Sequence, residues 1–132
     1  MVTVAEQTKE IVVVLANGSL TRPLSSWADR HAGWSVRLVD SGDKAAVLGA
    51  LLHADFCLIE ATECPERALT ILNAAAELLD GRSIAVYTEV ARQEVEAAAR
   101  RNWGLYTFGP MTDDEWDAFL PGGNHEPPPF WA

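Results

Sequence analysis

The sequence predicts a doubly wound α/β domain, in which helices cover both faces of a five-stranded parallel sheet. Five short apolar runs, rich in β-branched and aromatic residues, alternate along the chain with helix-like segments. Such alternation requires right-handed crossover connections, which place helices on both faces of a parallel sheet and give three layers. Ligands and chemistry in these sheets lie beyond the carboxyl ends of the strands. Those ends are therefore the place to look for function.

Each predicted strand is too short for a stable helix and is followed by polar residues, glycine or proline, which end a strand. The strands are expected at Ile11–Leu15, Trp34–Val39, Phe56–Ile59, Ser83–Tyr87 and Leu105–Phe108.

The helices are expected between the strands and after the last one. Their ranges are Pro23–His31, Asp43–His53, Pro65–Leu79, Ala91–Arg101 and Asp113–Leu120. The third is the best defined, because Pro65 suits the first helical turn and apolar residues follow at helical spacing. Before the last helix, the segment from Thr112 to Glu115 (TDDE) predicts a capping box.

Composition limits the classes of protein that this chain can belong to. The 132 residues include 19 acidic and 10 basic side chains, a net charge of −9, which argues against binding to nucleic acid or an anionic membrane. We expect a cytoplasmic protein, because the amino terminus lacks a secretory pattern and no apolar run could span a bilayer. One domain is expected over residues 1–121, followed by a proline-aromatic tail over residues 122–132.

Small and polar residues occupy the strand ends in a layout that resembles a known family. Ala16 and Asn17 follow the first strand, Glu60 the third, Thr88 the fourth, and Gly109 the fifth, with gaps of 43, 28 and 21 residues from Asn17 onward. This layout resembles the receiver domain of bacterial two-component response regulators, over roughly residues 9–120. The resemblance implies the strand order 2-1-3-4-5, which flavodoxins share.

The same resemblance identifies what has changed in the phosphorylation pocket. Receivers bind Mg²⁺ with an acidic pair after strand one and a phosphoacceptor Asp ending strand three. Here Ala16 and Asn17 stand at the acidic pair, and Glu60 stands at the phosphoacceptor position. A Thr or Ser after strand four and a Lys after strand five contact the phosphoryl group in the family. Thr88 keeps the hydroxyl, whereas Gly109 replaces the Lys.

These replacements predict a degenerate pocket without phosphoryl transfer. Mg²⁺ prefers carboxylate oxygens, and the missing Lys would have balanced charge on the transferring group. We therefore expect a pseudo-receiver that is not an enzyme and carries neither metal nor cofactor. Two interpretations of Glu60 stay open. Its carboxylate either imitates a phosphorylated Asp by accepting a hydrogen bond from Thr88, or is a solvated loop acid.

The resemblance also implies a signalling role through protein–protein interaction. Receivers bind partners, or one another, with the face formed by their fourth helix, fifth strand and fifth helix. Tyr106 matches the aromatic switch position of the family, and Trp116 is expected on or near that face. We expect a protein partner or self-association there, because large aromatic side chains anchor many interfaces.

Two alternatives come from other readings of the same strand ends. A flavodoxin-like protein would hold a flavin or nucleotide phosphate in the loop Asn17–Thr21, which offers one glycine and two hydroxyls. A receiver that still accepts phosphate at an unusual residue is the third interpretation. Cys64 precedes a predicted helix but has no histidine partner, so an ordinary loop cysteine is favoured over a nucleophile. Trp34 and Trp103 are expected to pack against the sheet or helices.

Overall fold

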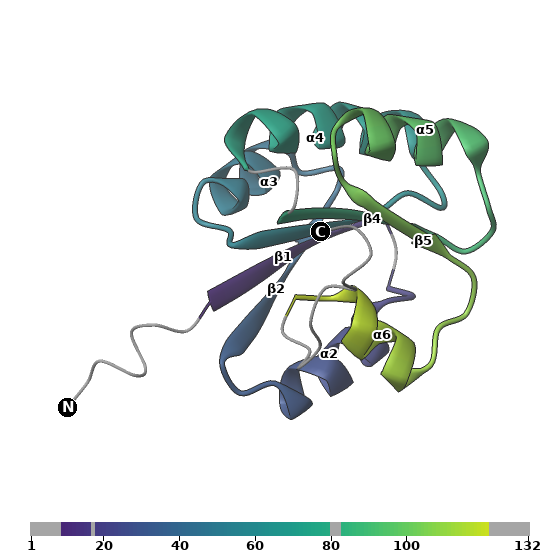
Figure 1. Ribbon diagram of the computed structural model, residues 1–132. Coiled ribbons are helices and arrows are strands. Elements are labelled where there is room, and N and C mark those ends of the chain that lie inside the picture. Colours follow the sequence, from purple (N-terminus) through teal and green to yellow (C-terminus); the bar gives the residue numbers. More distant parts are fainter. Residues whose placement is uncertain (1–8, 17, 80–82, 122–132) are drawn as a thin grey trace, which may run out of the picture.

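The computed structural model describes residues 9–16, 18–79 and 83–121, and its central sheet confirms the predicted fold class. Five parallel strands lie in the order β2-β1-β3-β4-β5 (Figure 1). Their bounds are β1 Lys9–Leu15, β2 Trp34–Asp40, β3 Phe56–Glu60, β4 Ile84–Thr88 and β5 Leu105–Phe108. Three strands end one residue later than expected, at Asp40 in β2, Glu60 in β3 and Thr88 in β4.

Helices cover the two faces of the sheet, as Figure 1 shows. The helices are α2 Thr21–Arg30, α3 Lys44–Leu51, α4 Pro65–Leu78, α5 Gln93–Arg101 and α6 Asp113–Phe119. α3, α4 and α5 cover one face, and α2 with α6 cover the other. None of the described helices is both long and apolar enough to cross a membrane. The proposed tail at residues 122–132 lies outside the described residues.

The alternation of β1 side chains divides the core into two clusters. Val12 and Val14 pack into the cluster under α3, α4 and α5. Ile11 and Val13 point to the opposite face and join the cluster under α2 and α6. Because both faces of the sheet are covered, β1 is a continuous apolar run instead of an alternating one.

Trp116 lies in the second of these clusters, and this corrects the expectation that it belongs to a partner face. Its side chain is 1% exposed and its ring packs against Tyr87, with ring centroids 5.6 Å apart. The reason is the position of α6, which is anchored beside α2 by contacts from Arg30 to Asp113 and Asp117. The apolar side of such a short helix can only face the sheet.

The cap of α6 confirms the sequence prediction. The Thr112 hydroxyl accepts from the Glu115 N–H at 3.2 Å, and the Glu115 carboxylate accepts from the Thr112 N–H at 2.8 Å. This reciprocal pair satisfies two backbone donors that a helix start would otherwise leave open. α2 differs from expectation, since it begins at Thr21, two residues before Pro23. A proline in the first turn has no intrahelical N–H bond to lose, so the helix extends past it.

Candidate functional site

The strand-end residues gather at the carboxyl edge of the sheet. Ala16 follows β1, Glu60 ends β3, Thr88 ends β4, and Gly109 follows β5. Because β1 and β4 both pair with β3, Glu60 lies between Ala16, which follows β1, and Thr88, which ends β4. Asn17 lies outside the described residues.

Glu60 is buried at this edge, and its carboxylate is held by backbone amides. The side chain is 2% exposed. One carboxylate oxygen accepts from the Thr62 N–H at 3.0 Å, and the other from the Ala16 N–H at 3.4 Å. Charge-assisted bonds of this kind compensate the loss of hydration on burial. The interpretation of Glu60 as a solvated loop acid is therefore wrong.

Thr88 bonds to Tyr106, and the described side chains of Glu60 and Thr88 do not form the hydrogen bond that one of the two interpretations of Glu60 required. The Thr88 hydroxyl is fully buried and lies 2.6 Å from the Tyr106 hydroxyl. The Tyr106 oxygen also accepts from the Arg92 N–H at 3.0 Å. Tyr106 is thus turned toward the strand-end pocket and joins β5, β4 and the start of α5 in one network.

Two loop residues that sequence analysis missed complete this network. Thr62 lies two residues after Glu60, and its hydroxyl accepts from the Glu89 N–H at 2.9 Å. The Arg92 guanidinium donates to the Thr62 carbonyl at 3.3 Å. Arg92 Nε is buried and has no hydrogen-bond partner among the described residues. Only their position in the sequence could have indicated a role, because Thr62 lies in the loop after β3 and Arg92 in the loop after β4.

Gly109 adopts a backbone conformation in which the family's lysine would be strained. Its φ angle is +85°, in the left-handed region that glycine adopts more readily than other residues. Its carbonyl accepts from the Tyr87 hydroxyl at 2.9 Å. Burial, together with the charges of Glu89 and Glu60, raises the pKa of that Tyr87 hydroxyl. The conformation of the loop after β5 is therefore held by the left-handed backbone of Gly109 and by its bond to Tyr87.

A cavity of about 430 Å³ opens beside the site. Pro23, Met111 and Trp116 supply apolar wall, and Glu89 supplies a carboxylate. None of the described residues that line the cavity is basic. A flavin phosphate would find no cation there to balance its charge, so the cavity gives no support to the flavodoxin-like alternative.

Cysteine and metal chemistry find little support at this edge. Cys57 is buried in β3, and burial raises the pKa of its thiol to about 12. Cys64 is half-buried and precedes α4. In the described ranges, no three or more His, Cys, Asp or Glu side chains form a group that could hold a metal ion.

Comparison with known proteins places the fold. No family model and no curated protein matches the chain. A response regulator protein from Burkholderia pseudomallei, solved with a phosphorylated aspartic acid, calcium ion and citrate, superposes with a TM-score of 0.68 at 19% identity, covering 85% of this chain and 66% of that one. A two-component response regulator from Clostridium difficile gives 0.67 at 13% identity, covering 83% and 90%.

A third solved structure agrees with these two. The CheY-like response regulator receiver domain protein from Methanospirillum hungatei JF-1 gives a TM-score of 0.66 at 16% identity, covering 82% of this chain and 86% of that one. At such identities the likeness concerns the fold. The chain has the five-stranded, three-layer α/β/α fold of CheY-like receiver domains.

Proposed function

We propose that this protein is a receiver-like signalling protein that works without phosphoryl transfer and acts by binding a protein partner or a second copy of itself. The observation that carries the proposal is the closed network at the strand ends. Tyr106 is held inward by Thr88 and Arg92. Both oxygens of Glu60 are occupied by backbone amides.

The chemistry of the pocket supports independence from phosphorylation. Phosphoryl transfer needs a cation-rich pocket, a metal held by carboxylates and a nucleophile free to attack. Ala16 offers no carboxylate, and Gly109 offers no cation. The Glu60 carboxylate would have to give up bonds to two N–H groups before it could attack a phosphodonor.

The position of Tyr106 supports a constant output state. In receivers, phosphorylation biases an existing equilibrium by drawing the strand-four hydroxyl and the strand-five aromatic inward. Here the two hydroxyls already lie 2.6 Å apart in an unmodified chain. One conformation is therefore expected to dominate, and the surface over β5 is presented without a trigger.

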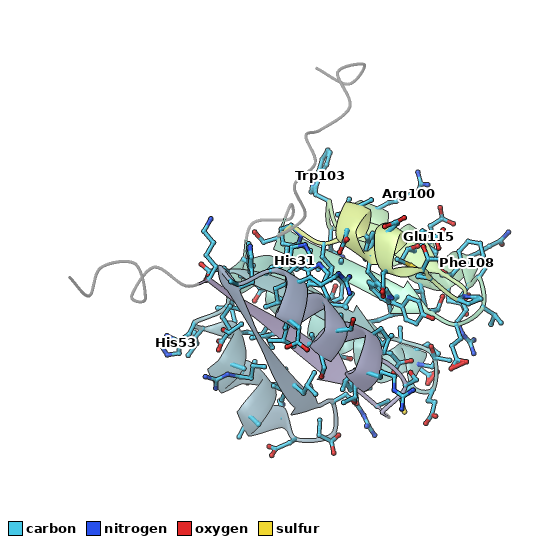
Figure 2. The ribbon with its side chains drawn as sticks, turned by 90° about the horizontal axis from the view of Figure 1, so that it is seen from below. His31, His53, Arg100, Trp103, Phe108 and Glu115 are labelled. Atoms are coloured by element: carbon cyan, nitrogen blue, oxygen red, sulfur yellow. The ribbon has the colours of Figure 1, made fainter. Side chains whose placement is uncertain are left out.

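That surface carries the apolar side chains a partner would need. Leu105 and Phe108 on β5 are 46% and 52% exposed, and Trp103, just before β5, is 82% exposed. Figure 2 shows Trp103 and Phe108 projecting at the periphery of the molecule. Trp103 has a φ of +61°, a costly conformation for a tryptophan. β5 is also an edge strand, and such edges are unpaired unless a partner covers them.

Incubation with a small acyl phosphate and Mg²⁺, read by intact-mass spectrometry, tests the proposal. The wild-type chain should gain no phosphoryl adduct. The matched variant Ala16→Asp/Asn17→Asp/Glu60→Asp/Gly109→Lys restores the family residues. A phosphoryl adduct on this variant, and not on the wild type, would show that these positions account for the lost reactivity. A Mg²⁺-dependent adduct on the wild-type chain would contradict the proposal. Circular dichroism confirms that both chains are folded.

A further inference from the structure

A second cavity, of about 270 Å³, lies between α3 and α4, on the face of the sheet opposite α2 and α6. Its lining separates into two chemical parts. Val47 and Ile71 are buried and form an apolar floor. Lys44 and Arg67 are exposed and stand at its rim, beside the buried hydroxyl of Ser41.

The two cations at this rim have no carboxylate partner among the described residues. The Arg67 guanidinium donates to the Ser41 hydroxyl at 3.3 Å. In the described ranges of this chain of net charge −9, Arg30, Arg37 and Arg100 each pair with a carboxylate, whereas Arg22, Arg92 and Arg101, like Lys44 and Arg67, do not. What distinguishes Lys44 and Arg67 is that both line one cavity whose described lining residues include no acid, so that together they can bind an external anion.

Two acids that precede α3 accept hydrogen bonds from backbone groups. The Asp40 carboxylate accepts from the Gly42 N–H at 2.8 Å, and the Asp43 carboxylate accepts from the Ala46 N–H at 3.1 Å. Gly42 lies between the Asp40 carboxylate and the Arg67 guanidinium, since an added Cβ would be 3.3 Å from Asp40 Oδ1 and 3.4 Å from Arg67 Nη1. The amino terminus of α3 opens at the same rim and adds partial positive charge.

We propose that this groove binds a small amphiphilic anion, meaning a single carboxylate or phosphate group on a short apolar chain. The anionic group would bond to Arg67, Lys44 and the Ser41 hydroxyl, and the apolar chain would cover Val47 and Ile71. The cavity falls just below the volume of about 300–1,000 Å³ that drug-sized ligands need, so a shorter molecule fits. The proposal uses none of the residues on which the proposed function rests.

Titration of the full chain, followed by two-dimensional amide NMR, tests the site with hexanoate and hexyl phosphate as probes. At least one probe should give saturable shifts confined to α3, α4 and the Ser41–Lys44 loop, and the tighter of the two identifies the anionic group. Hexanol lacks the charge and inorganic phosphate lacks the chain, so both should bind more weakly. Equal binding of inorganic phosphate would overturn the amphiphile, as would absence of saturable shifts with both probes.

Three variants separate a built site from general charge attraction. Arg67→Gln should weaken the tighter probe about tenfold, the loss expected for one charged hydrogen bond. Ala74→Leu adds volume in the cavity wall and should also weaken it, although no charge changes. Arg101→Gln removes an equal charge from an exposed position on α5 and should leave the affinity unchanged. Weakening by Arg101→Gln equal to that by Arg67→Gln, or full affinity in Ala74→Leu, would overturn the proposal.

Discussion

The hydroxyl pair of Thr88 and Tyr106 is the smallest unit on which the behaviour of this protein depends. Thr88 is buried with no access to water, so its hydroxyl needs a protein partner. Tyr106 supplies that partner at 2.6 Å and takes a second bond from the Arg92 N–H. Tyr106, the side chain that a switch would move, is therefore also the hydrogen-bond partner of the buried Thr88 hydroxyl.

Removal of the Tyr106 hydroxyl should destabilise the fold while keeping the ring. Tyr106→Phe leaves the Thr88 hydroxyl and the Arg92 N–H without their partner, and a buried unsatisfied group costs about 1–3 kcal/mol. Urea denaturation should show that loss in the free energy of unfolding. In the Tyr106→Phe background, Thr88→Val should cost less than it does in the wild type, because its hydroxyl no longer has a bond to lose. Strictly additive losses would show that the two hydroxyls are not coupled.

The elements show why some features of this chain were predictable and others were not. Strands β1, β3 and β4 are buried on both faces, so each is a continuous apolar run that sequence reveals directly. The capping box of α6 is equally local, because its residues lie within one turn. The partner of Thr88 is different. Glu60 and Tyr106 lie on opposite sides of β4, and choosing between them requires the packing of loops that sequence does not specify.

The capping box should contribute measurably to stability, since α6 is short and closes one face of the sheet. Thr112→Ala removes the acceptor for the Glu115 N–H, and loss of such a cap costs about 0.5–2 kcal/mol. Urea denaturation gives the free energy of unfolding. Asp114→Ala is the matched control, because Asp114 is exposed in the same first turn and is not part of the box. A loss in Thr112→Ala no larger than the loss in Asp114→Ala would contradict a contribution specific to the capping box.

At the scale of the whole molecule, two apolar clusters divide the sheet and decide which aromatic residues can meet a partner. Trp116 belongs to the cluster under α2 and α6. Trp103, expected to pack, is instead largely exposed. Sequence alone cannot separate these two cases, because a tryptophan in a short helix and one at a strand start are equally apolar. Whether each tryptophan is buried depends on the face of the sheet against which each helix packs. That face is set by how each strand is connected to the next.

The same division predicts opposite effects for two aromatic substitutions. Trp116→Ala empties space inside a core and should lower the free energy of unfolding by about 3–5 kcal/mol. Phe108→Ala changes a half-exposed side chain and should stay within about 1 kcal/mol of the wild type. If the surface over β5 binds a partner or a second copy, Phe108→Ala should nevertheless lose association. Urea denaturation of each variant gives the free energy of unfolding. Sedimentation velocity over a dilution series measures self-association, and pull-down with the same variants measures binding of a partner. Unchanged association and partner recovery in Phe108→Ala would show that the Phe108 end of β5 is not the binding surface. Trp103, the other exposed aromatic among the residues that the structure describes, would then be the side chain to substitute.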